Sequence, residues 1–282
     1  MDEWHDILPC LQNKQLVWYS QCSELFYAIS SRYIQQARWK RKGLAKVAKE
    51  GDLEGMRYLV EKGADLHSKN EEALQAASES GHLNVVKYLV EKGSDVHAGA
   101  EYALRLTSCF GHLEVVKYLV ENGGADVHVL HEDALRAASK HGHVEVVKYL
   151  ALECGADVHA CHNSALRDAS ENGHGKVVEC LVENGGADVN AWEGEALRNA
   201  SWHGHLEIMR CLVKNGADVH VWNEKALQTA SFNGHLDVVR YLVEEGGADV
   251  HADDDAALRW ARQYGHLEVL KYLESKGAVM PS

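Results

Sequence analysis

One short phrase recurs along the chain at a nearly constant interval. It reads Gly-His-Leu-Glu-Val-Val-Lys-Tyr-Leu at residues 111–119, and an Ala-Leu pair precedes each copy. The spacing between successive leucines of these pairs is constant to within a single residue, and Leu44 continues the series upstream; the others are Leu74, Leu104, Leu135, Leu166, Leu197, Leu227 and Leu258. A fixed period in this range indicates one supersecondary unit stacked many times. We therefore expect a solenoid, in which each unit contacts only its neighbours.

Each repeat is predicted to contain two helices joined by a tight turn. The small side chains of residues 73–80 predict a short helix that ends before Gly81 and allows close approach of neighbouring helices. Apolar residues then recur at helical spacing from Leu83 to Val90, which predicts a second helix with a broad apolar stripe. Gly93 is expected to end that helix in the left-handed conformation. Neither helix can bury its apolar face alone, so adjacent repeats must cover it.

This helix–turn–helix–loop unit, with the phrases Gly-His-Leu-Glu-Val-Val-Lys-Tyr-Leu-Val and Asp-Val-His, resembles the ankyrin repeat. The resemblance covers residues 43–282 in eight copies and implies an all-α, ankyrin-like repeat solenoid. The usual Thr-Pro-Leu-His opening is replaced by Glu-Ala-Leu-Gln, Asp-Ala-Leu-Arg or similar, and each repeat is shorter than usual between Asp-Val-His and Ala-Leu. We therefore expect short loops or reduced hairpins. The repeats are also similar to ankyrin arrays abundant in giant viruses of amoebae, which implies a viral protein that interacts with host proteins.

The resemblance implies non-catalytic protein recognition on a concave face made of the first helices and the loop tips. Exposed positions on this face are the second, fifth and sixth after each repeat leucine. In the C-terminal half, helices and loops carry six aromatic residues at non-framework positions: Trp202, Phe232, Trp260 and Tyr264 on helices, and Trp192 and Trp222 in loops. Large aromatic residues are enriched at binding hot spots, so these six are the candidate partner-binding residues. Alternatively, the rings only cover inner helices that shortened loops leave open.

Eighteen histidines raise the question of a metal site. Most follow either Gly or an Asp-Val pair, and equivalent positions in adjacent repeats are separated by the helix-packing distance of roughly 8–10 Å. Zinc ligands must all lie about 2.0–2.1 Å from one ion. We therefore expect the Gly-His histidines to bond backbone groups around the inter-helix turn, and we expect no metal or other cofactor. One loose cluster has the composition to assemble a site: His128, His131, His159, Cys161 and His162.

The sequence contains no arrangement of residues that indicates catalysis. A phosphate-binding glycine loop, a His-Glu-x-x-His motif and a nucleophile elbow are all missing from it. Cys180 and Cys211 occupy a position that is Tyr in most repeats, which indicates small apolar fillers. The arginines that follow most repeat leucines are expected to have a structural role, in salt bridges with nearby loop acids such as Glu132, Glu195 and Asp255 or in bonds to backbone carbonyls. Recognition of an acidic ligand is the alternative. We predict that the protein is not an enzyme and has no catalytic residues.

Residues 1–42 do not repeat and are expected to form a helical cap over the first repeat, because end units need protection. The phrases Asp-Ile-Leu-Pro-Cys-Leu at residues 6–11, Ser-Gln-Cys-Ser-Glu-Leu-Phe at residues 20–26 and Arg-Trp-Lys at residues 38–40 are also similar to a degenerate F-box. That similarity implies an alternative function, a substrate-recognition adaptor that binds the scaffold of a cullin-type ubiquitin ligase.

The formal charge of −13 disfavours general nucleic-acid binding. Residues 32–49 carry seven basic residues and no acid, which leaves −20 for the rest of the chain. This basic run could serve as a nuclear localisation signal or contact nucleic acid. Alternatively, it is a solvated helix end. No apolar run approaches the ~18 residues of a membrane span, and the acidic N-terminus is unlike a secretory signal. We expect an intracellular protein with protein partners and no membrane association, cytoplasmic in its own cell or a host cell, with nuclear localisation as the alternative.

Overall fold

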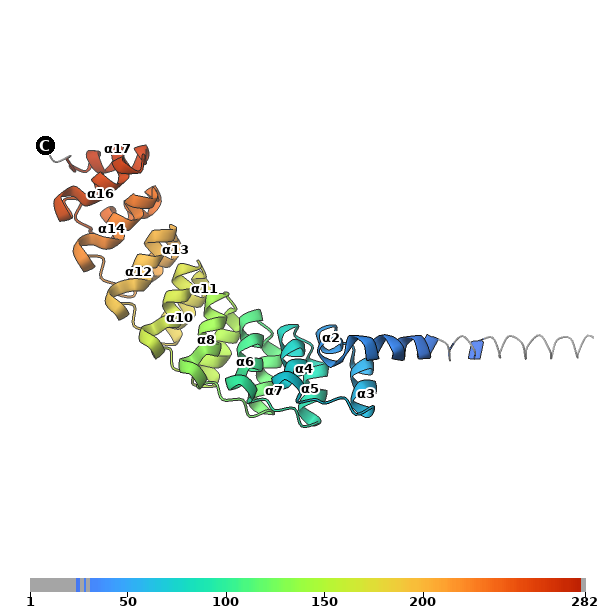
Figure 1. Cartoon of the computed structure of the whole chain (residues 1–282). Coiled ribbons are helices and arrows are strands. Elements are labelled where there is room, and N and C mark those ends of the chain that lie inside the picture. Colours follow the sequence, from blue (N-terminus) through green and yellow to red (C-terminus); the bar gives the residue numbers. More distant parts are fainter. Residues whose placement is uncertain (1–23, 26–27, 29–30, 280–282) are drawn as a thin grey trace, which may run out of the picture.

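The computed structural model describes residues 24–25, 28 and 31–279, and its helices stack in pairs along one curved array (Figure 1). The first helices of the eight pairs are α2 (Leu44–Lys49), α4 (Ser68–Glu79), α6 (Ala98–Phe110), α8 (Val129–Lys140), α10 (Ala160–Glu171), α12 (Ala191–His203), α14 (Val221–Asn233) and α16 (Ala252–Gln263). The second helices are α3 (Leu53–Glu61), α5 (Leu83–Glu91), α7 (Leu113–Glu121), α9 (Val144–Lys148), α11 (Gly175–Glu179), α13 (Leu206–Lys214), α15 (Leu236–Glu244) and α17 (Leu267–Ser275).

The apolar core runs as one continuous layer through the array. Each first helix packs against the first helix of the next repeat, and each second helix packs against its own first helix and the next second helix. The repeat leucines from Leu74 to Leu258 are at most 2% exposed, and the second helices bury residues such as Val86 and Leu89 completely. These residues lie at the predicted helical spacing. The predicted all-α repeat solenoid is therefore confirmed.

The small variation in repeat length is absorbed at the end of the second helix. Some repeats have one extra residue between the second helix and Ala-Asp-Val. In each of them, that residue donates its backbone N–H to the carbonyl five positions earlier. Examples are Gly123 to Tyr118 (3.1 Å) and Cys154 to Tyr149 (3.0 Å). After α9 and α11 the widened turn is a π-helical segment: η1 (Tyr149–Glu153) and η2 (Cys180–Asn184). The extra residue thus leaves the stacking of the repeats unchanged.

The Gly-His pair between the two helices joins each repeat to the preceding one. Each imidazole bonds through Nε2 to the backbone carbonyl two residues before the glycine of the preceding repeat, at 2.8–3.2 Å. The pairs are His82–Lys49, His112–Glu79, His143–Cys109, His174–Lys140, His205–Glu171, His235–Trp202 and His266–Phe232. The histidines bond backbone groups, as predicted, but the carbonyl belongs to the preceding repeat. The contact therefore acts between repeats.

The glycine of each Gly-His pair leaves room for the imidazole of the following repeat. Gly81 has a φ of +73°, and a Cβ atom built on it would lie 2.5 Å from Nδ1 of His112. Gly265, in the last repeat, has a φ of +76° but nothing within 4 Å of the same position. The two glycines therefore share a backbone requirement, whereas the steric requirement applies only where another repeat follows.

A left-handed turn opens the first helix of every repeat after the first. In α4, Lys69, Asn70 and Glu71 have φ values of 51°, 58° and 64°, and three residues at the start of α6, α8, α10, α12, α14 and α16 have the same conformation. These turns are the form that the expected short loops or reduced hairpins take, and residues 31–279 contain no strand. Left-handed helical backbone costs roughly 1–2 kcal/mol per residue, so each turn requires compensating contacts.

Polar side chains supply these contacts. The Asp95 carboxylate accepts the backbone N–H of His97 (2.9 Å), and Nδ1 of His97 bonds to Glu101, the last residue of the left-handed turn. Glu101 is only 3% exposed. Equivalent pairs are His67–Glu71, His128–Glu132, His220–Glu224 and His251–Asp255. Five turns are held in this way, so these five histidines are structural parts of their turns.

In some of the repeats, a polar side chain of the turn also bonds to the backbone of the next repeat, and this bond is present even where the residue type differs. Glu71 accepts the backbone N–H of Asp95 (3.1 Å). Asn163 replaces the glutamate of its turn and accepts the N–H of Asp188 (3.0 Å). In the following repeat, Asn190 replaces the histidine and accepts the N–H of Asp218 (2.8 Å). An acceptor for the neighbouring aspartate N–H is therefore kept in these repeats.

The first prediction concerns the glycine of the Gly-His pair. Gly265→Ala should lower the free energy of unfolding by about 1 kcal/mol, because alanine disfavours the left-handed region. Gly81→Ala should lower it by at least about 1 kcal/mol more, because the His112 ring must move. Urea unfolding of the full chain measures both values. Equal losses for the two variants would contradict the inter-repeat contact.

The second prediction concerns pH. The bond to Glu101 and its negative charge raise the pKa of His97 above its ordinary value of 6.5. A raised pKa in the folded state gives stability that is fully present below pH 6.5 and is lost as the pH rises through the folded pKa. Glu101→Gln should therefore destabilise the chain more at pH 6 than at pH 9, measured by urea unfolding. Glu114→Gln, on an exposed face of α7, makes the same charge change and should show no such difference.

Candidate functional site

The six aromatic candidates separate into two groups at opposite ends of the first helices. Trp202, Phe232 and Tyr264 lie at the C-terminal ends of α12, α14 and α16, and Trp260 lies one turn earlier in α16. Trp192 and Trp222 occupy the first positions of two left-handed turns. The structure therefore brings four of the six residues together and leaves the other two apart from them.

Trp202, Phe232, Trp260 and Tyr264 form a continuous aromatic cluster across three repeats. Trp202 stacks on Phe232 with ring centroids 5.4 Å apart, and Phe232 contacts Tyr264 at 4.1 Å and Trp260 at 5.7 Å. Trp202 is 48% exposed and Tyr264 is 49% exposed, whereas Phe232 and Trp260 are half-buried. The cluster thus combines rings that support one another with ring surface that faces solvent.

The two turn tryptophans are held by arginines of the preceding repeat. The Arg167 guanidinium lies 4.4 Å from the Trp192 ring centroid, and the Arg198 guanidinium lies 5.5 Å from that of Trp222. His162 also contacts Trp192 edge-on at 5.0 Å. Trp192 and Trp222 are 55% and 60% exposed. A cation over an aromatic face contributes about 0.5–1 kcal/mol at an exposed site, which orients the rings without burying them.

Arginine–carboxylate pairs lie along the first helices from α6 to α12. Arg105 and Arg136 both pair with Asp133, and Arg167 pairs with Glu195. Glu195 also lies 3.4 Å from Arg198, and Arg136 reaches Asp168 at 3.9 Å. The Arg105–Asp133, Arg136–Asp168 and Arg167–Glu195 pairs link adjacent first helices, and the other two lie within one helix. Both kinds agree with the predicted structural role of the arginines.

Of the three loop acids, only Glu195 pairs with these arginines, whereas Arg259 donates to the backbone carbonyl of Asp253 (3.0 Å), the other predicted kind of bond. Glu132 and Asp255 bond to His128 and His251 instead. Both carboxylates end a left-handed turn, and this position directs them to the histidine four residues earlier. Asp133 and Asp168 take part in the arginine pairs instead.

The chemistry-bearing residues considered for metal or nucleophilic roles do not converge. Within the described residues, no group of three or more His, Cys, Asp or Glu side chains is arranged to hold a metal ion. Of the loose cluster, His128 bonds to Glu132 and His162 contacts Trp192. Burial raises the pKa of the Cys180 and Cys211 thiols, which favours the unreactive protonated form.

The helical residues 31–42 contact the first repeat through Trp39. The indole Nε1–H donates to the Asp52 carboxylate (2.6 Å), and the ring lies 5.4 Å from that of Tyr58. Gly55 allows this approach, because a Cβ atom there would lie 2.5 Å from Nε1. Trp39 is 4% exposed, so the Arg-Trp-Lys phrase of the F-box resemblance places its tryptophan in the core of the array. The other phrases of that resemblance fall almost entirely outside the described residues.

A groove on the first three repeats was not predicted from the sequence. It has a volume of about 930 Å³ and is lined by α2, α4, the chain between α3 and α4, and one face of α6. The basic run at residues 32–49 lies at this end of the array, and Ala76, Glu79, Leu106 and Phe110, at positions predicted to be exposed on the first helices, line the groove. Neither signal predicted the hollow itself.

Among the helices described, none is both long and apolar enough to span a bilayer.

Comparison with known proteins identifies the repeat. Four overlapping segments, residues 18–100, 97–161, 151–223 and 197–281, match the family model described as ankyrin repeats (3 copies). A search of curated proteins found no similar sequence. The matched segments span nearly the whole array, and the helix pairs, Gly-His turns and continuous core agree with them. The chain therefore belongs to the ankyrin-repeat family.

Proposed function

We propose that the protein is a non-catalytic scaffold that binds a partner protein on the concave face of its C-terminal repeats. Ankyrin repeats are generally protein–protein interaction modules and are typically non-enzymatic. The aromatic cluster is the observation that carries the proposal. Exposed aromatic rings in contact with one another offer much apolar area at low entropic cost, as binding hot spots do.

The fold itself does not require aromatic residues at these positions. In α8 the equivalent positions hold Ala137, Lys140 and His141, yet the repeat leucine Leu135 is 1% exposed and the helix packs like its neighbours. Packing of the framework therefore leaves the rings unexplained, and partner binding explains both their clustering and their exposure. The turn tryptophans extend the proposed surface to the other end of the same helices.

The partner is proposed to be a protein, and a host protein if the chain comes from a virus. The adaptor alternative assigns the same surface to a ubiquitin-ligase substrate and residues 1–42 to the ligase scaffold. Burial of Trp39 favours the capping role for the adjoining segment. Ligase subunits that co-purify with the full chain would support the adaptor role over a scaffold without ligase contacts.

The third prediction tests the proposed surface. Affinity capture from extracts of the native or host cell, read by quantitative mass spectrometry, should recover a partner with the unaltered chain. Trp202→Ala combined with Trp222→Ala should lower that recovery at least about tenfold, because hot-spot truncation costs about 2 kcal/mol or more. The melting temperature should stay nearly unchanged, because both side chains are about half exposed.

Leu152→Ala is the matched control. Leu152 is 46% exposed and lies in η1, the continuation of a second helix, outside both the aromatic cluster and the groove on the first three repeats. Its substitution should leave partner recovery unchanged. Unchanged recovery with the double tryptophan variant, or a large fall in its melting temperature, would instead support a packing role for the rings.

A further inference from the structure

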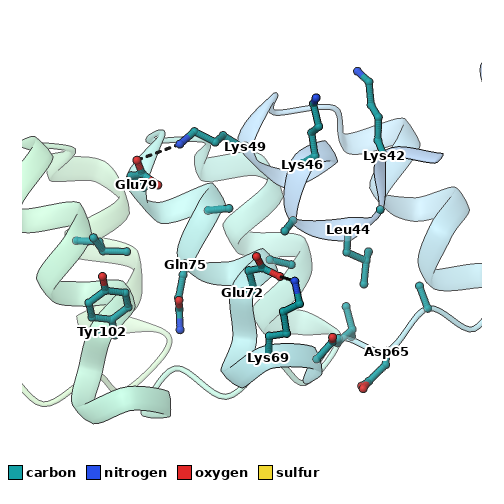
Figure 2. Close-up of a pocket in the computed structure, with 18 of the residues that line it drawn as sticks. Lys42, Leu44, Lys46, Lys49, Asp65, Lys69, Glu72, Gln75, Glu79 and Tyr102 are labelled. Atoms are coloured by element: carbon teal, nitrogen blue, oxygen red, sulfur yellow. Dashed lines mark hydrogen bonds and ion pairs between the residues drawn. The ribbon is translucent and has the colours of Figure 1, made fainter. Parts of the chain in front are cut away.

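The groove at the N-terminal end of the array has an apolar floor and a basic rim. Leu44, Leu66 and Ala76 contribute to the floor, and Tyr102 lies on the α6 side. Figure 2 shows Lys46 of α2 and Lys42, at the end of the helical residues 31–42, side by side along one edge, with Lys69 below them. We call this site, with its volume of about 930 Å³, the N-terminal groove.

The groove exists because the first repeat lacks a left-handed turn. The equivalent place further along the array is lined by Leu197, Asp218 and Val219. These residues have the same repeat positions as Leu44, Asp65 and Leu66 of the groove. The space beside them has a volume of only about 10 Å³. The turn residues Glu193 and Gly194 line that smaller space.

The first repeat has a different entry. The helical residues 31–42 lead into α2 through Gly43, which has a φ of +77°. Leu44 is consequently half-buried, whereas the seven later repeat leucines are at most 2% exposed. Among the eight helix pairs described, only the first therefore has a repeat leucine that a ligand can reach.

The charge of the groove differs from that of the rest of the chain. Lys42, Lys46, Lys49 and Lys69 line it, and residues 32–49 contain no acid, although the remaining chain carries −20. Three of these lysines have acidic neighbours: Lys42 pairs with Glu50, Lys49 lies 3.1 Å from Glu79, and Lys69 lies 3.1 Å from Glu72. Lys46 has no acidic partner within the described residues.

We propose that the N-terminal groove binds an acidic peptide segment of a partner protein. An apolar side chain of the segment packs on Leu44 and Leu66, and flanking carboxylates pair with Lys46 and Lys69. Lys69 exchanges its exposed pair with Glu72 for the ligand, at little cost because exposed ion pairs contribute only about 0–1 kcal/mol. The apolar floor favours a segment with an apolar side chain over a continuous phosphate backbone, which has no such group to place there. This site lies at the opposite end of the array from the aromatic cluster and is independent of it (Figure 1).

The fourth prediction tests this site. Selection on the full chain from a displayed library of random peptides of about 12 residues should enrich Asp and Glu around one or two Leu, Ile, Phe or Trp. A synthetic peptide of that class should bind the chain in fluorescence anisotropy. Lys46→Glu combined with Lys69→Glu should weaken its binding at least about tenfold, because the carboxylates then face like charges.

Two further variants make the test specific. Ala76→Trp fills the floor without changing the charge and should also weaken binding about tenfold; the array holds Trp260 at the equivalent position, so the fold accommodates the ring. Lys87→Glu combined with Lys176→Glu makes the same charge change on second helices and should leave binding unchanged. Circular dichroism of each variant verifies that the array is folded.

Four results would overturn the proposal. The first is a selection that yields no acidic class of peptides. The second is a folded Lys46→Glu, Lys69→Glu variant that binds the peptide as tightly as the unaltered chain does. The third is a single-stranded DNA oligonucleotide that binds more tightly than the peptide and loses its binding with the same substitutions. The fourth is peptide binding that appears only after Asp2, Glu3 and Asp6 are changed to amides, because the groove would then be occupied by this chain's own N-terminus. None of these outcomes depends on Trp202 or Trp222, so they leave the C-terminal surface to its own test.

Discussion

Burial of apolar surface between neighbouring repeats is the constraint on which the rest of the structure depends. Each helix pair exposes two apolar faces that it cannot cover alone, and the stack reduces the exposure of the repeat leucines from Leu74 to Leu258 to 2% or less. The Gly-His contact sets the register of this burial. The imidazole of one repeat occupies the space that a glycine leaves open in the preceding repeat and bonds the carbonyl two residues before that glycine. Apolar packing thus supplies the driving force, and these polar contacts specify its alignment.

The short repeat has a second consequence, which concerns function. With too few residues for a hairpin, the chain crosses from one repeat to the next through a left-handed turn held by histidine–carboxylate pairs. These turns place Trp192 and Trp222 at the surface and close the space beside each repeat leucine. In the first repeat the turn is replaced by the end of the helical residues 31–42, and the N-terminal groove opens there. One local conformation therefore accounts for features in both halves of the array.

The sequence predicted most of the periodic structure, because each periodic signal is repeated many times. The second helix from Leu83, the left-handed Gly93 and the buried repeat leucines were all predicted from spacing. The left-handed turns were not predicted, because a shortened loop specifies how many residues must cross the gap but not their backbone conformation. The partners of the arginines were partly wrong for the same reason, since the turn directs Glu132 toward His128. The aromatic residues were identified as candidates, but their contacts depend on how residues one repeat apart meet across the stack. The groove had no direct signal, because it results from a turn that one repeat lacks.

The overall shape in solution tests the central claim most directly. A compact globule of this length would have a radius of gyration of about 19 Å. Eight repeats stacked at roughly 10 Å intervals form an array about 80 Å long, which gives a radius of gyration of about 25 Å or more. Small-angle X-ray scattering of the monomeric full chain measures this quantity. The larger of these two radii, with a pair-distance distribution extended to large separations, is the result expected for a single curved stack. The radius of the compact globule, with a symmetric distribution, would contradict it.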